Sequence, residues 1–461
     1  MGVSTALKAF KSGIGFDALL SSSRDMKLLI LLRMIRLFAC GGATLILALY
    51  LSALQFSDAS IGLFMTLTLV GDLVISVLLT YIGDGMGVRV TMALGSLLMA
   101  GSGIAFAFLD NYWLLLLASI AGVINPSANE VDPFKAIEES AIARLSPPEQ
   151  CSDFFAWWSL LGMFGTAAST LLTGFAVERL QAVSGFSAVE SYKIMFLAYA
   201  AVGVVKLLCS FLVSRQVELN SCPDSPNPAD KDHTPDDQTP LLGSVETQYS
   251  TVSPAKISES KPESVPPARL FTPQSFSFMW KLSLAMALDF VGSGLAQISW
   301  MSYFFKREYH VGEDELGIAI FVASLVSSVL NLASSPLSRS IGQIQTMVVC
   351  HTINSISLLM ISVPNKNLAL MLLIFRIVTR ELDNAPRQAF ISAGVLNEER
   401  TSAMGCVNVV KTVGSCLGLY LTGQFAGMGK FWIAFMVAGC LKLGYNVLIV
   451  AFFWNHKART A

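Results

Sequence analysis

The chain has 461 residues, of which 53% are hydrophobic and only 14% are charged, and its mean hydropathy is +0.60. A soluble globular protein carries about 25% charged residues because its surface faces water. The composition therefore excludes an ordinary soluble domain and predicts an all-α integral membrane protein. The formal net charge of −1 gives no indication of nucleic-acid binding, and the eight cysteines form no C-x-x-C pair that would predict a metal site.

Twelve transmembrane helices are predicted by the rule that a helix needs roughly 20 mostly apolar residues to cross the bilayer. Polar residues interrupt the fourth and tenth of these spans. Basic residues gather on the side that holds both chain ends, so residues 1–26 and 455–461 are expected in the cytoplasm. The expected spans are 27–53, 59–82, 88–109, 112–144, 151–177, 191–213, 275–304, 312–337, 344–364, 367–394, 402–427 and 430–454.

The segment 214–273 is rich in Pro, Ser, Asp and Thr and has almost no aromatic residues. Such a composition cannot bury enough apolar surface to fold, so we expect a disordered cytoplasmic linker between bundles at 27–213 and 274–454. Asp237, Leu241 and Leu242 within it fit an acidic dileucine sorting pattern. The pattern predicts a sorting adaptor as partner and favours a vacuolar or endosomal membrane over the plasma membrane, which stays the alternative.

The two halves repeat in the same direction with an offset of about 250 residues. Related by an axis along the membrane normal, such six-span halves form a known transporter architecture with the substrate site at their interface. The matching segments are Ile61-Gly62 with Leu316-Gly317, Glu130-Val131-Asp132 with Glu381-Leu382-Asp383, and Leu172-Thr173-Gly174 with Leu421-Thr422-Gly423.

The loop after the second span reads Gly-Asp-Gly-Met-Gly-Val-Arg over residues 83–89. It resembles the D-R-x-G-R-R signature of the major facilitator superfamily, matching it at Asp84, Gly87 and Arg89, while Gly85 and Val88 replace two arginines. The sequence most resembles fungal members without an assigned substrate. The resemblance implies two parallel-related six-helix bundles and a gating role for Asp84, Gly87 and Arg89, although the lost arginines weaken that network.

Charged residues within the first and seventh spans are functional candidates, because an intramembrane charge costs several kcal/mol unless it is paired or hydrated. Arg36 and Asp289 lie 253 residues apart and are repeat counterparts. In the family fold their helices face each other across the cavity. We expect these two residues to pair across it or to bind a charged substrate, and a static buried pair is the alternative. Arg33 is expected to extend to the lipid headgroups instead.

Prolines interrupt the fourth and tenth spans, and interrupted spans at corresponding repeat positions point to a transport site. The excess of arginine in the tenth span favours an anionic or zwitterionic substrate, since guanidinium binds carboxylate and phosphate bidentately. A charge network that only locks helix packing is the alternative. Arg380 and Asp383 are three residues apart and are predicted to pair, whereas Glu138 is expected to protrude into water. The candidates are Glu130, Asp132, Arg376, Arg380, Glu381 and Asp383.

Two single charges complete the candidate set. Asp72 lies in the middle of the second span, where a buried carboxyl group could carry a proton. Lys411 lies well inside the eleventh span. Trp157 and Trp158 are expected to pack or to anchor the fifth span rather than to stack on a ligand.

No Walker A loop and no set of catalytic residues is recognisable. We therefore expect no ATP hydrolysis, no other enzymatic activity and no cofactor. The sequence predicts a monomeric secondary transporter of a small solute that works by alternating access. Asp72, Asp289 or Glu381 would couple the transport to protons. A non-transporting receptor or scaffold with the same fold, signalling through the central loop, is the alternative hypothesis.

Overall fold

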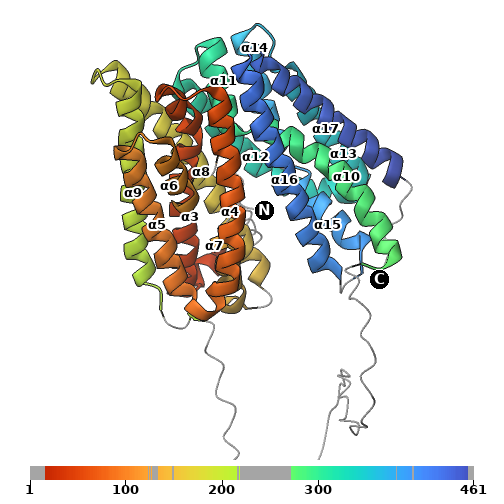
Figure 1. Ribbon diagram of the computed structural model, residues 1–461. Coiled ribbons are helices and arrows are strands. Elements are labelled where there is room, and N and C mark those ends of the chain that lie inside the picture. The colour runs from red at the N-terminus through yellow and green to blue at the C-terminus, as the bar shows by residue number, and fades with distance from the viewer. Residues whose placement is uncertain are drawn as a thin grey trace, which may run out of the picture.

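The computed structural model describes residues 16–122, 124, 126, 133–147, 150–214, 217, 218, 271–380, 382–396 and 399–454. These residues form two helical bundles that approach each other at the upper end of Figure 1 and diverge toward the lower end, where α9 (Ala188–Phe211) ends and α10 (Pro273–Leu295) begins. The predicted all-α membrane fold is confirmed.

The N-terminal bundle consists of helices from residue 16 to residue 211. Besides α9 they are α2 (Phe16–Ser21), α3 (Arg24–Ala53), α4 (Asp58–Met86), α5 (Val88–Phe108), α6 (Tyr112–Gly122), α7 (Pro133–Leu145) and α8 (Cys151–Ala182). The C-terminal bundle repeats this order. Besides α10 it holds α11 (Ile298–Tyr309), α12 (Glu313–Ile341), α13 (Gln343–Met360), α14 (Lys366–Arg380), α15 (Asn384–Gly394), α16 (Arg400–Gly427) and α17 (Phe431–Phe453).

The predicted spans and the observed helices agree closely along the chain. Eight helices in the described part are long and apolar enough to cross a membrane, namely α3, α4, α5, α8, α9, α10, α16 and α17. The other four predicted spans correspond to α12, to α13 and to the divided helices α6/α7 and α14/α15. As predicted, the fourth and tenth spans are interrupted.

The seventh span is also broken, which the sequence pattern did not predict. It was expected to be continuous from 275 to 304, but α10 ends at Leu295 and α11 begins at Ile298. The carbonyl groups at the end of a helix have no partner within it. Here Thr422 donates to the Leu295 carbonyl at 2.9 Å, and Arg376 donates to the Ala296 carbonyl at 2.5 Å. Side chains from other helices thus stabilise a break that no local proline causes.

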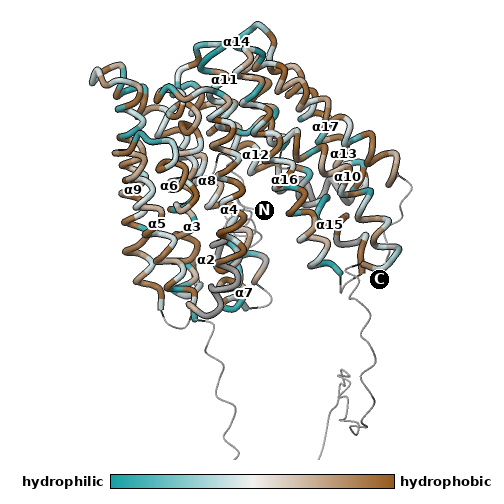
Figure 2. The backbone as a smooth tube through the Cα atoms, viewed as in Figure 1, coloured by the Kyte–Doolittle hydropathy of each residue, from teal (hydrophilic) through white to brown (hydrophobic). Residues whose placement is uncertain are grey.

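Hydrophobic residues are spread along the helices of both bundles (Figure 2), and many of them have exposed side chains. Val77, Leu117, Leu208, Val329 and Val447 are each more than 60% exposed. Contiguous exposed apolar surface is rare on soluble proteins, and in hydrocarbon only helices or closed barrels satisfy their own backbone. These side chains therefore face lipid.

The parallel repeat is visible in how the helices pack. Within the first bundle α3 packs closely on α8, and a Cβ at Gly41 would lie 2.4 Å from the Thr166 carbonyl oxygen. Their repeat counterparts α10 and α16 pack in the same way, with a Cβ at Gly294 lying 2.4 Å from the Ser415 carbonyl oxygen. Both pairs need glycine so that two backbones can approach.

Two glycine contacts join the bundles on the side away from the end of α9 and the start of α10. A Cβ at Gly62 of α4 would lie 2.9 Å from the Gly423 Cα of α16, and a Cβ at Gly317 of α12 would lie 3.4 Å from the Gly174 Cα of α8. These are the glycines of the sequence repeat, so the two contacts are copies of one interface. They let α4/α16 and α8/α12 cross closely and close this end.

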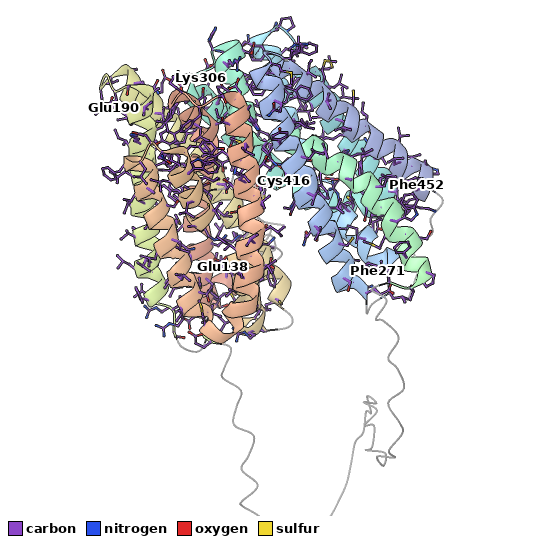
Figure 3. All side chains as sticks on the ribbon, in the orientation of Figure 1. Glu138, Glu190, Phe271, Lys306, Cys416 and Phe452 are labelled. Carbon is purple, nitrogen blue, oxygen red and sulfur yellow. The ribbon has the colours of Figure 1, made fainter. Side chains whose placement is uncertain are left out.

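A hydrogen-bonded cluster supports the same closure. Asp58 at the start of α4 accepts from the Tyr303 hydroxyl at 2.8 Å and pairs with Arg307 at 2.7 Å. Tyr192 of α9 donates to Glu313 of α12 at 2.7 Å. Both sets join the first bundle to the second, near the end where Figure 3 labels Lys306.

We expect Gly423→Leu to prevent this closure, because the added side chain must displace the α4 backbone and overpacked contacts are destabilising. Modification of Cys416, made the sole cysteine, by an impermeant maleimide added from that side should rise about tenfold, in line with roughly 1–3 kcal/mol of overpacking. Gly405→Leu is the matched control, since a Cβ at Gly405 on the same helix meets nothing within 4 Å. Equal labelling of the two variants would contradict the role of the glycine contact.

Candidate functional site

A cavity of about 560 Å³ lies between the two bundles. Its size falls within the roughly 300–1,000 Å³ of small-molecule sites. α3, α4, α7 and α8 line it from one bundle, and helices from α10 to α17 line it from the other. Its place between repeat halves is where transporters of this architecture bind solutes.

The cavity wall is strongly cationic. Seven Lys or Arg side chains line it, whereas Glu139 and Asp289 are its only carboxylates among the described residues. Charges surrounded by low-dielectric protein and lipid are screened less than in water, so these side chains act strongly on a charged solute. The seven cations are Arg33, Lys135, Arg376, Arg380, Arg387, Lys411 and Lys442.

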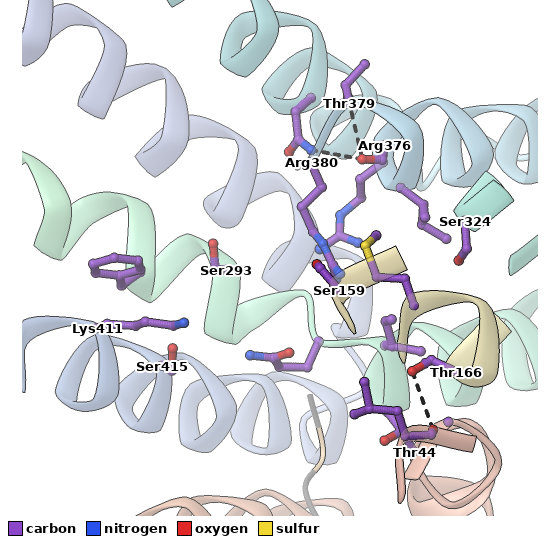
Figure 4. Close-up of a pocket in the computed structure, with 18 of the residues that line it drawn as sticks. Thr44, Ser159, Thr166, Ser293, Ser324, Arg376, Thr379, Arg380, Lys411 and Ser415 are labelled. Atoms are coloured by element: carbon purple, nitrogen blue, oxygen red, sulfur yellow. Dashed lines mark hydrogen bonds between the residues drawn. The ribbon is translucent and has the colours of Figure 1, made fainter. Parts of the chain in front are cut away.

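Figure 4 shows how part of this wall is arranged. Arg376 and Arg380 extend from α14 toward the centre of the close-up, and Lys411 extends from α16. Ser159 of α8 comes from the opposite bundle. The predicted candidates Arg376, Arg380 and Lys411 therefore meet around one space.

Asp289 is the centre of a buried ionic cluster in the C-terminal bundle. Its Oδ1 lies 2.5 Å from Lys442 Nζ and 2.8 Å from His351 Nε2, and its Oδ2 lies 3.0 Å from Arg387 Nη1. Lys442 also donates to Ser293 at 2.8 Å. One carboxylate of α10 thereby ties together α13, α15 and α17.

Arg36 does not pair with Asp289, contrary to the sequence expectation. Its guanidinium binds Glu138 of α7 at 2.7 Å, within the first bundle. Glu138, which was expected to protrude into water, is fully buried. The equivalent bond in the second bundle joins Asp289 to Arg387 with the signs reversed. In each half the first long helix is thus bonded to the second part of the interrupted span: α3 to α7 in the first bundle, and α10 to α15 in the second.

Asp383 pairs with Arg387 rather than with the predicted partner Arg380. The i, i+3 geometry requires one continuous helix, but α14 ends at Arg380 and α15 begins at Asn384. Arg380 remains at the cavity wall. Asp383 is 1% exposed and belongs to the ionic cluster around Asp289 instead.

Arg33 is buried and does not extend to the headgroups as expected. Its guanidinium lies over the Trp158 ring, 3.3 Å from the ring centroid. Such cation–π contacts stabilise a desolvated cation by about 2 kcal/mol. Both residues line the cavity, so Trp158 positions a cation of the wall, in addition to the packing role that was predicted for it.

Asp72 lies away from this site. It is fully buried in α4, it does not line the cavity, and neither carboxylate oxygen has a hydrogen-bond partner in the described part of the chain. Thr68, one turn earlier on the same face, bonds to Ser119 of α6 at 3.2 Å. The carboxyl group therefore points into the first bundle.

Gly87 is the N-cap of α5 with a φ of +81°, and a Cβ there would lie 2.2 Å from the Glu218 carboxylate. Only glycine fits such a position easily. Its counterpart Gly342 begins α13 with a φ of +98°. Arg89 is half-buried near this loop. The side chain of Asp84, the residues Glu130, Asp132 and Glu381, and the sorting residues Asp237, Leu241 and Leu242 lie outside the described residues.

Three further ionisable residues were not identified by the sequence analysis. His351 and Lys442 complete the Asp289 cluster, and Lys206 of α9 is buried near Arg36 and Glu138. The only available signal was the position of these residues inside apolar helices. Asp289, the partner of His351 and Lys442, lies 62 and 153 residues away from them in sequence.

The fold and cavity can be compared with known proteins. The family model of the Major Facilitator Superfamily matches residues 282–461. An uncharacterized membrane protein of Saccharomyces cerevisiae, YJR124C, is 30% identical over 442 residues, which cover 95% of this chain and 96% of that protein. The chain belongs to the major facilitator superfamily.

Solved structures of other superfamily members share the fold. A bacterial homolog of the human lysosomal transporter Spinster, inward-facing and occupied, has a TM-score of 0.63 at 15% identity and covers 92% of this chain and 94% of its own. The D-xylose-proton symporter has a TM-score of 0.66 at 11% identity, with 95% and 100% covered. The human organic anion transporter MFSD10 has a TM-score of 0.56 at 12% identity, with 93% and 100% covered. This multi-pass membrane protein therefore has the twelve-helix transporter fold.

Proposed function

We propose that the chain is a secondary transporter that carries a small anionic solute by alternating access. The observation that carries this proposal is the wall of the central cavity, where the described residues include seven Lys or Arg side chains and two carboxylates. One of these carboxylates, Asp289, is already bonded to Lys442, Arg387 and His351. A solute with carboxylate or phosphate groups can accept charge-assisted hydrogen bonds from such a wall.

The break between α10 and α11 adds to the attraction for an anion. Gln297 and Ile298, at the start of α11, line the cavity. The N-terminus of a helix carries a partial positive charge and donor amides, and broken helices of transporters direct such ends at anionic substrate groups. Arg376 holds the end of α10 at 2.5 Å and lines the same space.

Cations from both bundles contribute to the proposed binding site. Arg33 lies on α3 of the first bundle, whereas Arg380 and Lys411 lie on α14 and α16 of the second. An anion held between them favours closure of the halves around it, because its charge is attracted to both. Arg36 and Asp289 instead hold each half together, and we assign them no direct contact with the solute.

The arrangement of the bundles corresponds to one end of an alternating-access cycle. The glycine contacts and the Asp58 cluster close the upper end in Figure 1, while the bundles diverge toward its lower end. With both termini in the cytoplasm, as the basic residues predict, this is the inward-open state. The similar structure of the bacterial Spinster homolog is likewise described as inward-facing.

Uptake into proteoliposomes tests this function. The purified protein is presented with labelled succinate, inorganic phosphate, glutamate, a hexose and a polyamine, each with and without an imposed pH gradient. We expect uptake of at least one of the anions and none of the polyamine. Uptake limited to the cation or to the neutral sugar, or binding without any flux, would contradict the proposal and would favour a receptor in the last case.

A further inference from the structure

His351 lies in the wall of the cavity and is the only histidine among the described residues that touches the ionic cluster of Asp289. It sits on α13, is 4% exposed, and both of its ring nitrogens face oxygen atoms. Nε2 lies 2.8 Å from Asp289 Oδ1, and Nδ1 lies 3.0 Å from Asn446 Oδ1. A neutral imidazole has one donor nitrogen and one acceptor nitrogen, so it cannot satisfy both contacts.

The orientation of the Asn446 amide is fixed by its other neighbour. The hydroxyl group of Thr352 has one proton, and it donates this proton to the Val348 carbonyl at 2.6 Å. Thr352 Oγ1 must therefore accept from Asn446, which places Asn446 Nδ2 at 3.0 Å from it. The amide oxygen is left facing His351, so Nδ1 has to donate.

The contact at Nε2 leads to the same protonation state. Asp289 Oδ1 also accepts from Lys442 at 2.5 Å, and Oδ2 accepts from Arg387 at 3.0 Å. A carboxylate held by two cations is ionised and can only accept. Nε2 therefore donates as well, and with both nitrogens protonated the ring of His351 is an imidazolium cation.

We propose that His351 is the proton-binding site that couples solute transport to the proton gradient, an inference that rests on the proposed carriage of an anion. Loss of the Nε2 proton would turn a lone pair toward the Asp289 carboxylate, break this hydrogen bond and remove one positive charge from the cavity wall. Gain of the proton restores both. An anion and a proton therefore favour each other's binding, as linkage requires, which makes the protein an anion–proton symporter.

The groups around the ring of His351 determine how strongly it holds its second proton. Asp289 stabilises the added proton, and Lys442 and Arg387 oppose it from α17 and α15. Tyr445 packs against the ring edge-on, with centroids 4.7 Å apart. Two further charges lie behind these: Asp383, which pairs with Arg387, and Arg376, which lies close to Lys442.

Nitrogen NMR of the full-length protein tests the protonation state without any solute. His233, His310 and His456 are replaced by Gln, so that His351 is the sole remaining histidine. With ¹⁵N-labelled histidine, we expect two protonated ring nitrogens at pH 7 and a change to one at alkaline pH. A ring with one protonated nitrogen at pH 7, or a spectrum that does not change with pH, would overturn the inference.

The coupling is measured in vesicles loaded with the pH dye pyranine. Addition of succinate or phosphate to the wild-type protein should acidify the lumen as the anion enters. His351→Gln should lose at least tenfold in proton-driven accumulation, and the anion entry that remains should no longer acidify the lumen. His310→Gln is the matched control, because His310 lies at the exposed end of α11. Solute entry without proton entry in the wild type, or unchanged accumulation in His351→Gln, would overturn the coupling, whereas absence of all anion entry would count against the proposed function.

Discussion

Asp289→Asn is expected to destabilise the protein more than any other single substitution in the cavity wall. It leaves His351, Lys442 and Arg387 buried around a neutral amide, although the wild-type carboxylate lies within 3.0 Å of all three. Removing one partner of a buried ion pair costs about 3–5 kcal/mol because the other charge remains desolvated. Thermal unfolding of the purified protein in detergent should show a fall of many degrees.

Asp110→Asn serves as the control for this measurement. Asp110 forms an ion pair with Lys193 at 2.7 Å, but it is more than half exposed, and exposed pairs contribute only about 0–1 kcal/mol. The second substitution Lys442→Met should recover part of the loss in Asp289→Asn, because it removes one of the stranded charges. A variant Asp289→Asn as stable as Asp110→Asn would show that the cluster does not hold the bundle together.

Lys411→Glu is expected to reduce uptake of the transported anion about 100-fold, since a reversed charge at the wall converts an attraction into a repulsion of several kcal/mol at partly buried distances. Lys411 is only half-buried and extends into the cavity, so the fold should tolerate the change. The loss should appear in the affinity for the anion and should increase with the charge of the solute.

Lys430→Glu is the matched control, because it makes the same charge reversal at an exposed residue just before α17. Its uptake should stay within twofold of the wild type. Uptake is measured in proteoliposomes together with the unfolding temperature of each variant. If Lys411→Glu transports the anion as the wild type does, the cation excess of the cavity is not the basis of selectivity.

The repeat gives these two experiments a common interpretation. Each bundle contains a buried ion pair between its first long helix and the lower part of its broken helix, Arg36 with Glu138 and Asp289 with Arg387. The pairs have opposite sign and lie on corresponding helices. Each half can therefore move as a rigid body while the cations between them, Arg380 and Lys411 among them, meet the solute.

Many of the charged residues that line the cavity could be predicted from the sequence, but the ion pairs that they form could not. Residues such as Arg376, Arg380 and Lys411 were identified because charge is costly within an apolar span, and all three line the cavity. Arg36 and Asp289 were correctly placed as repeat counterparts, yet each bonds within its own half. Repeat symmetry specifies equivalent positions and does not say which residue is in contact with which.

The sequence by itself determined the twelve spans, the interrupted fourth and tenth helices and the parallel repeat, because hydropathy, proline and local similarity act over a few residues or a fixed offset. Only the tertiary structure decided that the seventh span breaks at Ala296, that Glu138 is buried, and that His351 lies between Asp289 and Asn446. The reason is physical in each case: the partner that stabilises the feature lies on another helix, 80 residues away for Ala296, 102 for Glu138 and 62 for His351.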